Sequence, residues 1–168
     1  ADPSIKCGYV TVPEEHDKSN GRTIKLAVVV LAATPDGANG AQSGATRKPD
    51  PLIMLQGGPG GGTIDTYNLL MRNNPVRTER DIVLFDQRGT GKSLPALMCD
   101  ETYALAVQDA ERRVEYDESL RKYDEALATC RDRLVKSGVS FNAFDSVENA
   151  RDIDIVRQAL GYDRINLY

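Results

Sequence analysis

The residues best suited to chemistry in this chain are the glycines of one short loop, Gln56–Gly62 (QGGPGGG). Glycine has no Cβ, so a reacting group can approach the main-chain N–H donors of such a loop closely. A helical pattern begins at Thr63, which places these donors near a helix N-terminus, where negative charge is favoured. Two kinds of negative charge would fit: a bound phosphate, or an oxyanion that exists only during a reaction.

A nucleotide-binding loop is the first alternative. A P-loop needs G-x-x-x-x-G-K-[ST], in which the Lys contacts the phosphates, but Gly62 stands at the Lys position here. A second glycine-rich segment, Asp86–Ser93 (DQRGTGKS), ends in GKS but has Asp86 where the first Gly belongs. A dinucleotide-binding fingerprint also matches poorly, because Pro59 interrupts the loop and strand-like segments precede it. Neither segment is therefore a P-loop.

The two glycine-rich segments together resemble the α/β-hydrolase fold, and within it the proline iminopeptidase and tripeptidyl-aminopeptidase group of serine peptidases. That group carries an H-G-G-P-G-G loop after its third strand and a D-x-R-G-x-G-x-S loop after its fourth; here Gln56–Gly61 and Asp86–Ser93 follow in the same order. The segments Cys7–Pro13, Leu94–Cys99 and Leu160–Tyr168 look most like the tripeptidyl-aminopeptidase branch. The resemblance thus runs along the whole chain.

The resemblance implies roles for the first loop in a serine hydrolase of acyl-transfer type. The backbone N–H of Gly58, with that of Gly57 next, is expected to supply one half of the oxyanion hole. Gln56, Pro59 and Gly60 are expected to contact the substrate. Gln56 stands where the group usually has His, so the role of that side chain does not carry over directly.

The second loop is expected to be structural. Asp86 and Arg88 can tie the turn to neighbouring backbone through charge-assisted hydrogen bonds, and Gly89 and Gly91 supply the tight geometry. Ser93 is not expected to be a nucleophile, because it lacks the G-x-S-x-G context in which a sharp strand-to-helix turn exposes the hydroxyl.

The catalytic triad is not expected within these residues. In the fold that the chain resembles, the strand matching Ile165–Tyr168 leads directly into the nucleophile elbow, and the acid and the His follow later. The sole histidine, His16, comes just after the first expected strand and is badly placed for a triad base. We therefore expect residues 1–168 to be the N-terminal portion of one α/β-hydrolase core domain, ending just before the elbow. Such a chain would be inactive alone and would associate with a complementary C-terminal part that carries the triad.

Apolar patterns predict the elements that hold the two loops. Strands are expected at residues 7–12, 23–34, 51–55, 81–85 and 164–168. The first two should form an antiparallel hairpin, and the others read as buried strands of a parallel sheet. Helices are expected near 64–72 and from Ser146 as N-cap to a stop at Gly161. The fold class is therefore α/β, with a mostly parallel sheet, an antiparallel N-terminal hairpin and a helical excursion after the fourth strand.

The helical excursion is expected at residues 99–146. Within it, residues 101–136 are charged and helical in their apolar period, with a break near 116–118 that separates two helices. Its many carboxylates are most simply explained as a solvated helix face. The glycine-, serine- and proline-containing segment 35–50 has no periodicity and is expected to be a surface loop.

The three cysteines leave two alternatives open. Cys7, Cys99 and Cys130 are either buried thiols of a cytoplasmic protein, or Cys99 and Cys130 form a disulfide that closes the excursion and leaves Cys7 over. A disulfide indicates an oxidising compartment. The members of the group that the chain resembles are largely exported bacterial enzymes, so the resemblance favours a secreted or periplasmic protein.

Composition limits the partners. The chain is 40% hydrophobic and 27% charged, which is ordinary for a globular protein. The net charge is −4 and the basic residues are scattered, so nucleic acid is not an expected partner. No apolar run approaches the roughly 18 to 20 residues that cross a bilayer. No cofactor and no metal are expected.

By resemblance, the substrate would be a short peptide cleaved from its free N-terminus. A carboxylester hydrolase is the alternative among enzymes. The alternative from another class is a protein without catalytic activity that uses this part of the α/β-hydrolase sheet for binding. A nucleotide-binding protein is the third alternative.

Overall fold

The structure is a computed structural model, and it describes residues 2–18, 21–34, 46–58 and 60–168. The chain divides into two compact units. The first comprises Ala1–Ala96 and Asn142–Tyr168, and the second comprises Leu97–Phe141.

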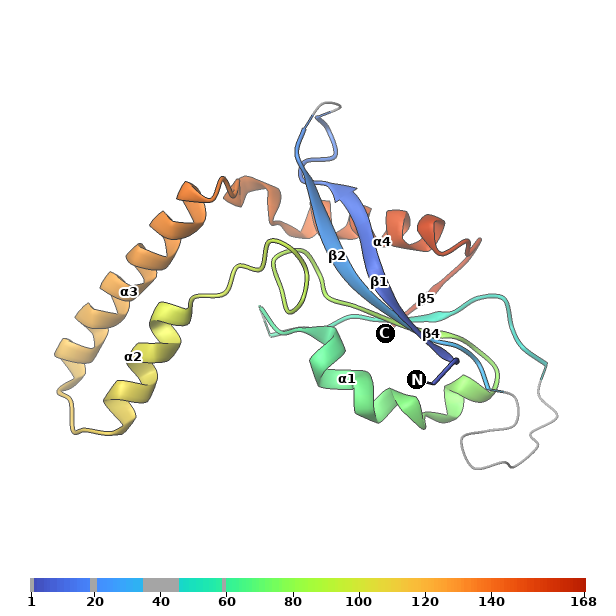
Figure 1. Cartoon of the computed structure of the whole chain (residues 1–168), viewed down its shortest axis with the longest axis horizontal. Helices are drawn as coiled ribbons and strands as arrows, with labels where there is room; N and C mark the ends of the chain where they lie inside the picture. Colours follow the sequence, from blue (N-terminus) through green and yellow to red (C-terminus); the bar gives the residue numbers. More distant parts are fainter. Residues whose placement is uncertain (1, 19–20, 35–45, 59) are drawn as a thin grey trace. The chain divides into compact units, whose positions relative to one another are not determined.

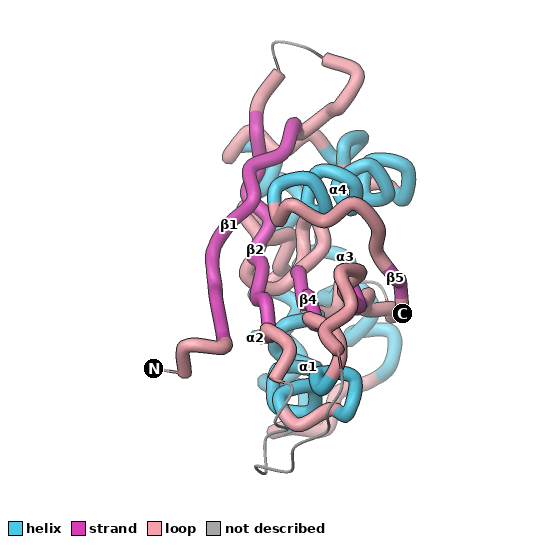
Figure 2. Tube along the Cα trace, turned by 90° about the vertical axis from the view of Figure 1, so that its right-hand side faces the viewer, coloured by secondary structure: helices cyan, strands magenta, loops and turns pink. Residues whose placement is uncertain are grey.

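The first unit is built on a five-stranded sheet (Figure 1). Its strands are β1 (Ile5–Pro13), β2 (Thr23–Leu31), β3 (Leu52–Met54), β4 (Ile82–Phe85) and β5 (Asn166–Leu167). Their order is β1-β2-β4-β3-β5, so β1 and β5 lie at opposite edges (Figure 2). β2 pairs antiparallel with β1 and β4, whereas β3 pairs parallel with β4 and β5. The expected N-terminal hairpin and mostly parallel sheet are confirmed, because β2 alone among these strands runs against the others.

One helix covers each face of this sheet (Figure 1). The helix α4 (Ser146–Ala159) packs through Ile153 and Val156 against one face, and α1 (Thr63–Arg72) packs through Ile64 against the other. Alternate residues of the central strands therefore face two separate cores, and both cores are apolar, as in parallel sheets covered on both sides. Buried residues of the two cores include Leu26, Val28, Val83 and Phe85 on the α4 face, and Val29, Leu31, Leu84 and Met54 on the α1 face.

The ends of α4 refine the expected boundaries. The N-cap is Asp145 rather than Ser146: the Asp145 carboxylate accepts a hydrogen bond from the Glu148 N–H at 2.8 Å, and Ser146 is the first helical residue. An aspartate caps as well as a serine does, and only the backbone geometry selects between two adjacent candidates. At the other end, Gly161 follows the C-cap Leu160 with a φ of +76°, as expected of a helix stop.

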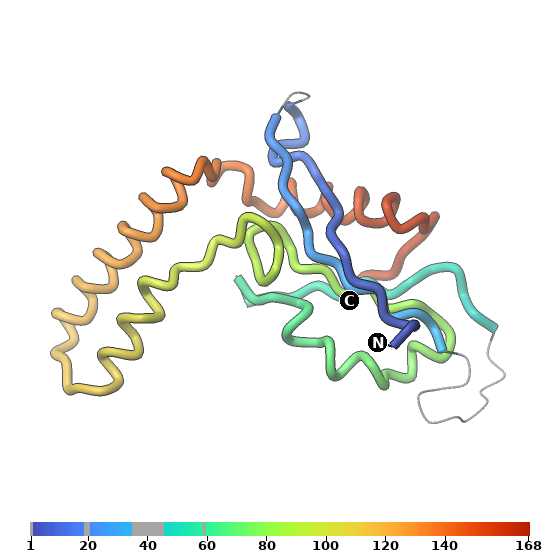
Figure 3. The backbone as a smooth tube through the Cα atoms, viewed as in Figure 1, coloured from blue at the N-terminus to red at the C-terminus, as the bar shows by residue number. Residues whose placement is uncertain are grey.

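The second unit is a pair of helices that run side by side, α2 (Asp100–Ala110) and α3 (Tyr116–Lys136) (Figure 3). The expected break near 116–118 lies at 111–115 instead, because Tyr116 already belongs to α3. Cys99 and Cys130 form a disulfide, and Cys7 is free and exposed. The alternative of three buried thiols is therefore wrong. In the described residues, two short 3₁₀ helices are also present, η1 (Pro75–Thr78) and η2 (Phe141–Ala143).

Several expected strands are shorter than predicted, and one is not buried. The strand expected at 164–168 is reduced to β5, where Leu167 is 54% exposed. Its apolar composition suggested burial, but β5 has only β3 as a neighbour. Residues 35–45 of the expected surface loop lie outside the described residues. None of the helices in the described ranges is both long and apolar enough to cross a membrane.

Candidate functional site

The glycine loop after β3 adopts backbone conformations that other residues avoid. Gly58 has a φ of +62° and Gly60 a φ of +96°, both in the left-handed region that favours glycine. A Cβ at either position would meet nothing within 4 Å, so backbone conformation rather than crowding requires glycine there. Pro59, one of the residues expected to contact substrate, lies outside the described residues.

The main-chain N–H groups of Gly57 and Gly58 are available to a ligand. Both residues are exposed, and neither N–H donates a hydrogen bond to an acceptor in the described ranges. The loop leads directly into α1, whose N-cap is Gly62, and the Asp86 carboxylate binds the Ile64 N–H in its first turn. Unpaired N–H donors beside a helix N-terminus favour negative charge.

A pocket of about 330 Å³ lies beside these donors. Three segments line it: the glycine loop, the loop after β4 and the start of α4. The lining residues are Gln56, Gly57, Gly58, Gly60, Gln87, Arg88, Thr90, Phe144, Asp145, Ser146 and Asn149. The structure therefore brings Arg88 of the second loop to the same pocket as the described residues expected to bind substrate.

Asp86 connects the second loop to α1. Its buried carboxylate accepts hydrogen bonds from the Ile64 N–H at 2.9 Å and the Lys92 N–H at 2.7 Å. A Cβ on Gly91 would lie 2.2 Å from Asp86 Oδ2, so the carboxylate can reach these amides only because residue 91 is glycine. Gly89, with a φ of +77°, forms an isolated parallel bridge with Ala96.

The Ser93 hydroxyl has a structural role, because it makes two hydrogen bonds within the protein. It donates to the Asp86 carbonyl oxygen at 2.5 Å and accepts from the Ala27 N–H at 3.0 Å, and the side chain is buried. The first of these hydrogen bonds ties the end of the second loop to its start, and the second holds it against β2. The hydroxyl therefore has no freedom to attack a substrate in this structure.

Arg88 joins the second loop to α4 and to the end of β1. Its guanidinium donates two hydrogen bonds to the Asp152 carboxylate, at 2.8 Å and 2.7 Å. It also donates to the Glu14 carbonyl oxygen at 2.7 Å and to the carbonyl oxygen of Ala143. The network thus links the second loop to α4, to η2 and to the end of β1, and it contains a buried cation paired with a buried anion.

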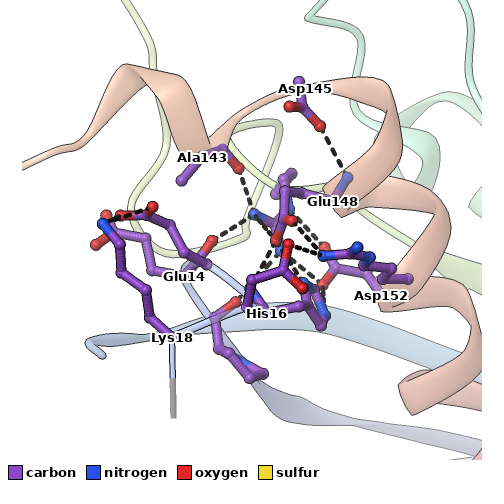
Figure 4. A network of polar contacts seen from close by, with 12 residues as sticks. Glu14, His16, Lys18, Ala143, Asp145, Glu148 and Asp152 are labelled. Carbon is purple, nitrogen blue, oxygen red and sulfur yellow. Dashed lines mark hydrogen bonds and ion pairs between the residues drawn. The ribbon is translucent and has the colours of Figure 1, made fainter. Parts of the chain in front are cut away.

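His16 extends this network in a way that the sequence did not indicate (Figure 4). Its Nδ1 lies 2.5 Å from Glu148 Oε2, and its backbone N–H donates to the same oxygen at 2.9 Å. Its Nε2 lies 3.4 Å from Asp152 Oδ1, within ion-pair distance but outside hydrogen-bond geometry. The imidazole therefore sits between two carboxylates of α4. The sequence carried only one sign of this cluster, which is that Glu148 and Asp152 are four residues apart and so share a helix face.

The pKa values of the two carboxylates in this cluster are shifted in opposite directions. Burial by itself raises the pKa of Glu148, but the hydrogen bonds from the His16 side chain and backbone outweigh burial and lower the pKa. Burial raises the pKa of Asp152, and the hydrogen bonds and charge of Arg88 only partly offset that rise. The polar network thus keeps Glu148 anionic while Asp152 depends on Arg88 for its charge.

The fold and the two loops define a class of protein: the chain has the N-terminal part of an α/β-hydrolase fold, with the glycine loop after β3 and the D-x-R-G-x-G-x-S loop after β4 at one pocket. No family model matches the chain.

Comparison with known proteins gives relatives of the expected kind. A tripeptidyl aminopeptidase of Streptomyces lividans is 32% identical over 168 residues, which cover 96% of this chain and 30% of the relative. Carboxylesterase B of Mycobacterium tuberculosis is 32% identical over 165 residues, covering 93% and 29%. A serine protease of the same organism is 30% identical over 164 residues, covering 95% and 29%. The predicted resemblance to α/β-hydrolase serine peptidases is confirmed, and the chain spans less than a third of these relatives' length.

Proposed function

We propose that the chain is the N-terminal portion of a serine hydrolase, in which the glycine loop supplies one half of the oxyanion hole. The observation that carries this proposal is the pair of unpaired N–H groups of Gly57 and Gly58 at the edge of a pocket. Preorganised backbone donors of this kind stabilise the negative charge that develops on a carbonyl oxygen during acyl transfer.

The proposed reaction follows the general scheme of serine hydrolases. A serine, activated by a His and an acid from the rest of the polypeptide, attacks the substrate carbonyl and forms a tetrahedral intermediate. The Gly58 N–H donates to the oxyanion, and the second donor is the N–H of the residue after the nucleophile. Loss of one such donor typically lowers the rate by about 10²- to 10³-fold.

The proposed substrate is a short peptide cleaved from its free N-terminus. The relatives named as a tripeptidyl aminopeptidase and a serine protease support a peptidase. A carboxylester hydrolase is the second candidate, because one relative is named a carboxylesterase. The same oxyanion site serves both reactions, so the glycine loop does not distinguish them.

We further propose that the triad lies in the remainder of the polypeptide and that this chain alone is inactive. The exposed Leu167 supports this arrangement, because an apolar strand at a sheet edge invites another strand to pair with it. The Cys99–Cys130 disulfide supports a secreted or periplasmic location, since disulfides persist in oxidising compartments.

The test uses the full-length polypeptide that carries this chain. We expect it to react with a fluorophosphonate, which labels activated serines, and to hydrolyse a tripeptidyl p-nitroanilide with a free N-terminus. Gly58→Ala should lower kcat, because alanine avoids a φ of +62° and the N–H would turn away from the pocket. Gly8→Ala, whose Cβ meets nothing within 4 Å, is the matched control. Absence of both labelling and turnover in the wild-type protein contradicts the proposal, whereas ester hydrolysis without peptidase activity favours the carboxylesterase.

A further inference from the structure

Two carboxamide side chains from distant segments line the pocket without a partner for their oxygens. Gln56 begins the glycine loop and Asn149 lies in the first turns of α4. In the described part of the chain, the buried side-chain atoms that lack a hydrogen-bond partner are Gln56 Oε1, Asn149 Oδ1, His16 Nε2 and Thr63 Oγ1. Both carboxamides of this set thus belong to one pocket.

A buried amide oxygen without a hydrogen-bond partner is uncommon and calls for an explanation. The large majority of buried side-chain polar atoms have a hydrogen-bond partner, because leaving one unpaired is costly. No hydrogen-bond partner in the described residues therefore accounts for the buried Asn149 Oδ1.

The surroundings of Asn149 hold it in a fixed position. Glu148, the preceding residue, binds His16, and Asp152, one turn further on, binds Arg88. These contacts anchor the start of α4 to β1 and to the second loop, so the helix cannot turn to give the amide another partner. A rigid support with an unpaired polar group is the arrangement expected of a binding site.

The chemistry of the two amides indicates what they would bind. A carboxamide offers one acceptor oxygen and two N–H donors, and a peptide group offers the complementary N–H and C=O. An ester has no N–H to donate. The terminal torsion of Asn and Gln side chains is broad, so a small rotation can turn either amide towards a ligand in the pocket.

We propose that Gln56 and Asn149 form a subsite that hydrogen-bonds the peptide backbone of the substrate, and so favours peptides over plain esters. This subsite rests on the proposed hydrolase function. It assigns Asn149 a role in specificity. It also explains why Gln56 can stand where related loops have His, because a carboxamide can both donate a hydrogen bond to a peptide C=O and accept one from a peptide N–H.

The experiment compares two substrates of the full-length polypeptide, a tripeptidyl p-nitroanilide and p-nitrophenyl butyrate. We expect Asn149→Leu to lower the ratio of their kcat/KM values, peptide over ester, by about 5- to 100-fold, the range for losing one hydrogen bond to a buried partner. Asn149→Asp, which keeps an oxygen acceptor, should retain more of the ratio. Gln158→Leu removes an amide from the exposed end of the same helix and is the matched control.

Thermal stability provides the second readout. Asn149→Leu replaces a half-buried amide, whose oxygen is buried and unpaired, with an apolar group of similar size, so the melting temperature should stay the same or rise. A lower melting temperature with an unchanged ratio would show that Asn149 is structural and overturn the subsite. An unchanged ratio at unchanged stability would also overturn it, and would indicate a trapped water as the partner. Wild-type protein that hydrolyses neither substrate would instead refute the proposed function itself, which separates the two failures.

Discussion

The Arg88 guanidinium binds the Asp152 carboxylate through two parallel hydrogen bonds, from Nε at 2.8 Å and from Nη2 at 2.7 Å. The side chains are 2% and 0% exposed, so the ion pair is shielded from water. Arg88 follows β4 and Asp152 lies in α4, and both of these segments contribute walls of the pocket. The ion pair therefore sets the position of one wall relative to the other.

Removal of one partner of this pair should destabilise the protein strongly. We expect Arg88→Ala to lower the free energy of unfolding by about 3–5 kcal/mol, because it leaves the Asp152 carboxylate buried without its cation. Urea titration measures the change. Arg131→Ala removes an exposed guanidinium that pairs with Asp132, and it should change the stability by less than about 0.5 kcal/mol. Equal effects of the two substitutions would contradict this account of the network.

The second loop should not tolerate a side chain at position 91. Gly91 has a φ of +49°, and its Cβ would overlap the Asp86 carboxylate. We expect Gly91→Ala to cost about 2 kcal/mol or more, from backbone strain and from the displaced hydrogen bonds to Ile64 and Lys92. Thermal unfolding measures the loss, with Gly8→Ala as the control. A neutral effect at position 91 would mean that Asp86 does not hold the loop in solution.

Asp81 should make stability depend on acid pH. Burial alone raises the pKa of its carboxyl, but hydrogen bonds from the Ala33 N–H, the Tyr162 hydroxyl and Arg47 outweigh it and lower the pKa. Because the pKa is lower in the folded state, the stabilising contribution is complete above the ordinary pKa near 4 and is lost as the pH falls through the lowered value. Asp81→Asn should therefore cost about 1.5–3 kcal/mol at pH 7 and less at pH 3.

Urea titrations at the two pH values test this expectation. Asp132→Asn, which changes an exposed carboxylate on α3, serves as the control for general effects of charge. The expectation fails if Asp81→Asn costs the same at both pH values, since the Asp81 carboxylate would then contribute nothing that titrates.

The Cys99–Cys130 disulfide should be a main support of the helical unit. The two cysteines are 31 residues apart. Closing a loop of that length lowers the entropy of the unfolded chain and so raises its free energy by about 3–4 kcal/mol. Reduction, or Cys130→Ser, should therefore expose α2 and α3 to proteolysis, which gel analysis of limited digests detects. Cys7→Ser should leave the digestion pattern unchanged, because Cys7 is exposed and free. Resistance of the reduced protein would show that helix packing alone is sufficient.

The sequence by itself determined the elements and the two loops. Glycine clusters, apolar runs and the helical period are local signals, because backbone freedom and burial leave their mark within a few residues. They were sufficient for the N-terminal hairpin, for the start of α1 after the Gln56–Gly62 loop and for the resemblance to α/β-hydrolases. They failed where two adjacent residues were equally suitable, as at the Asp145 N-cap.

Only the tertiary structure decided which distant side chains meet. His16 and Glu148 are 132 residues apart, and Arg88 and Asp152 are 64 apart. These contacts depend on the order of the strands and on the face of the sheet that α4 covers, and no local pattern encodes either. The same holds for Asn149, whose helical position was readable but whose place in the pocket follows from packing. A buried charge is costly unless it is paired, and only the packing of the whole core decides which oppositely charged side chain lies beside it.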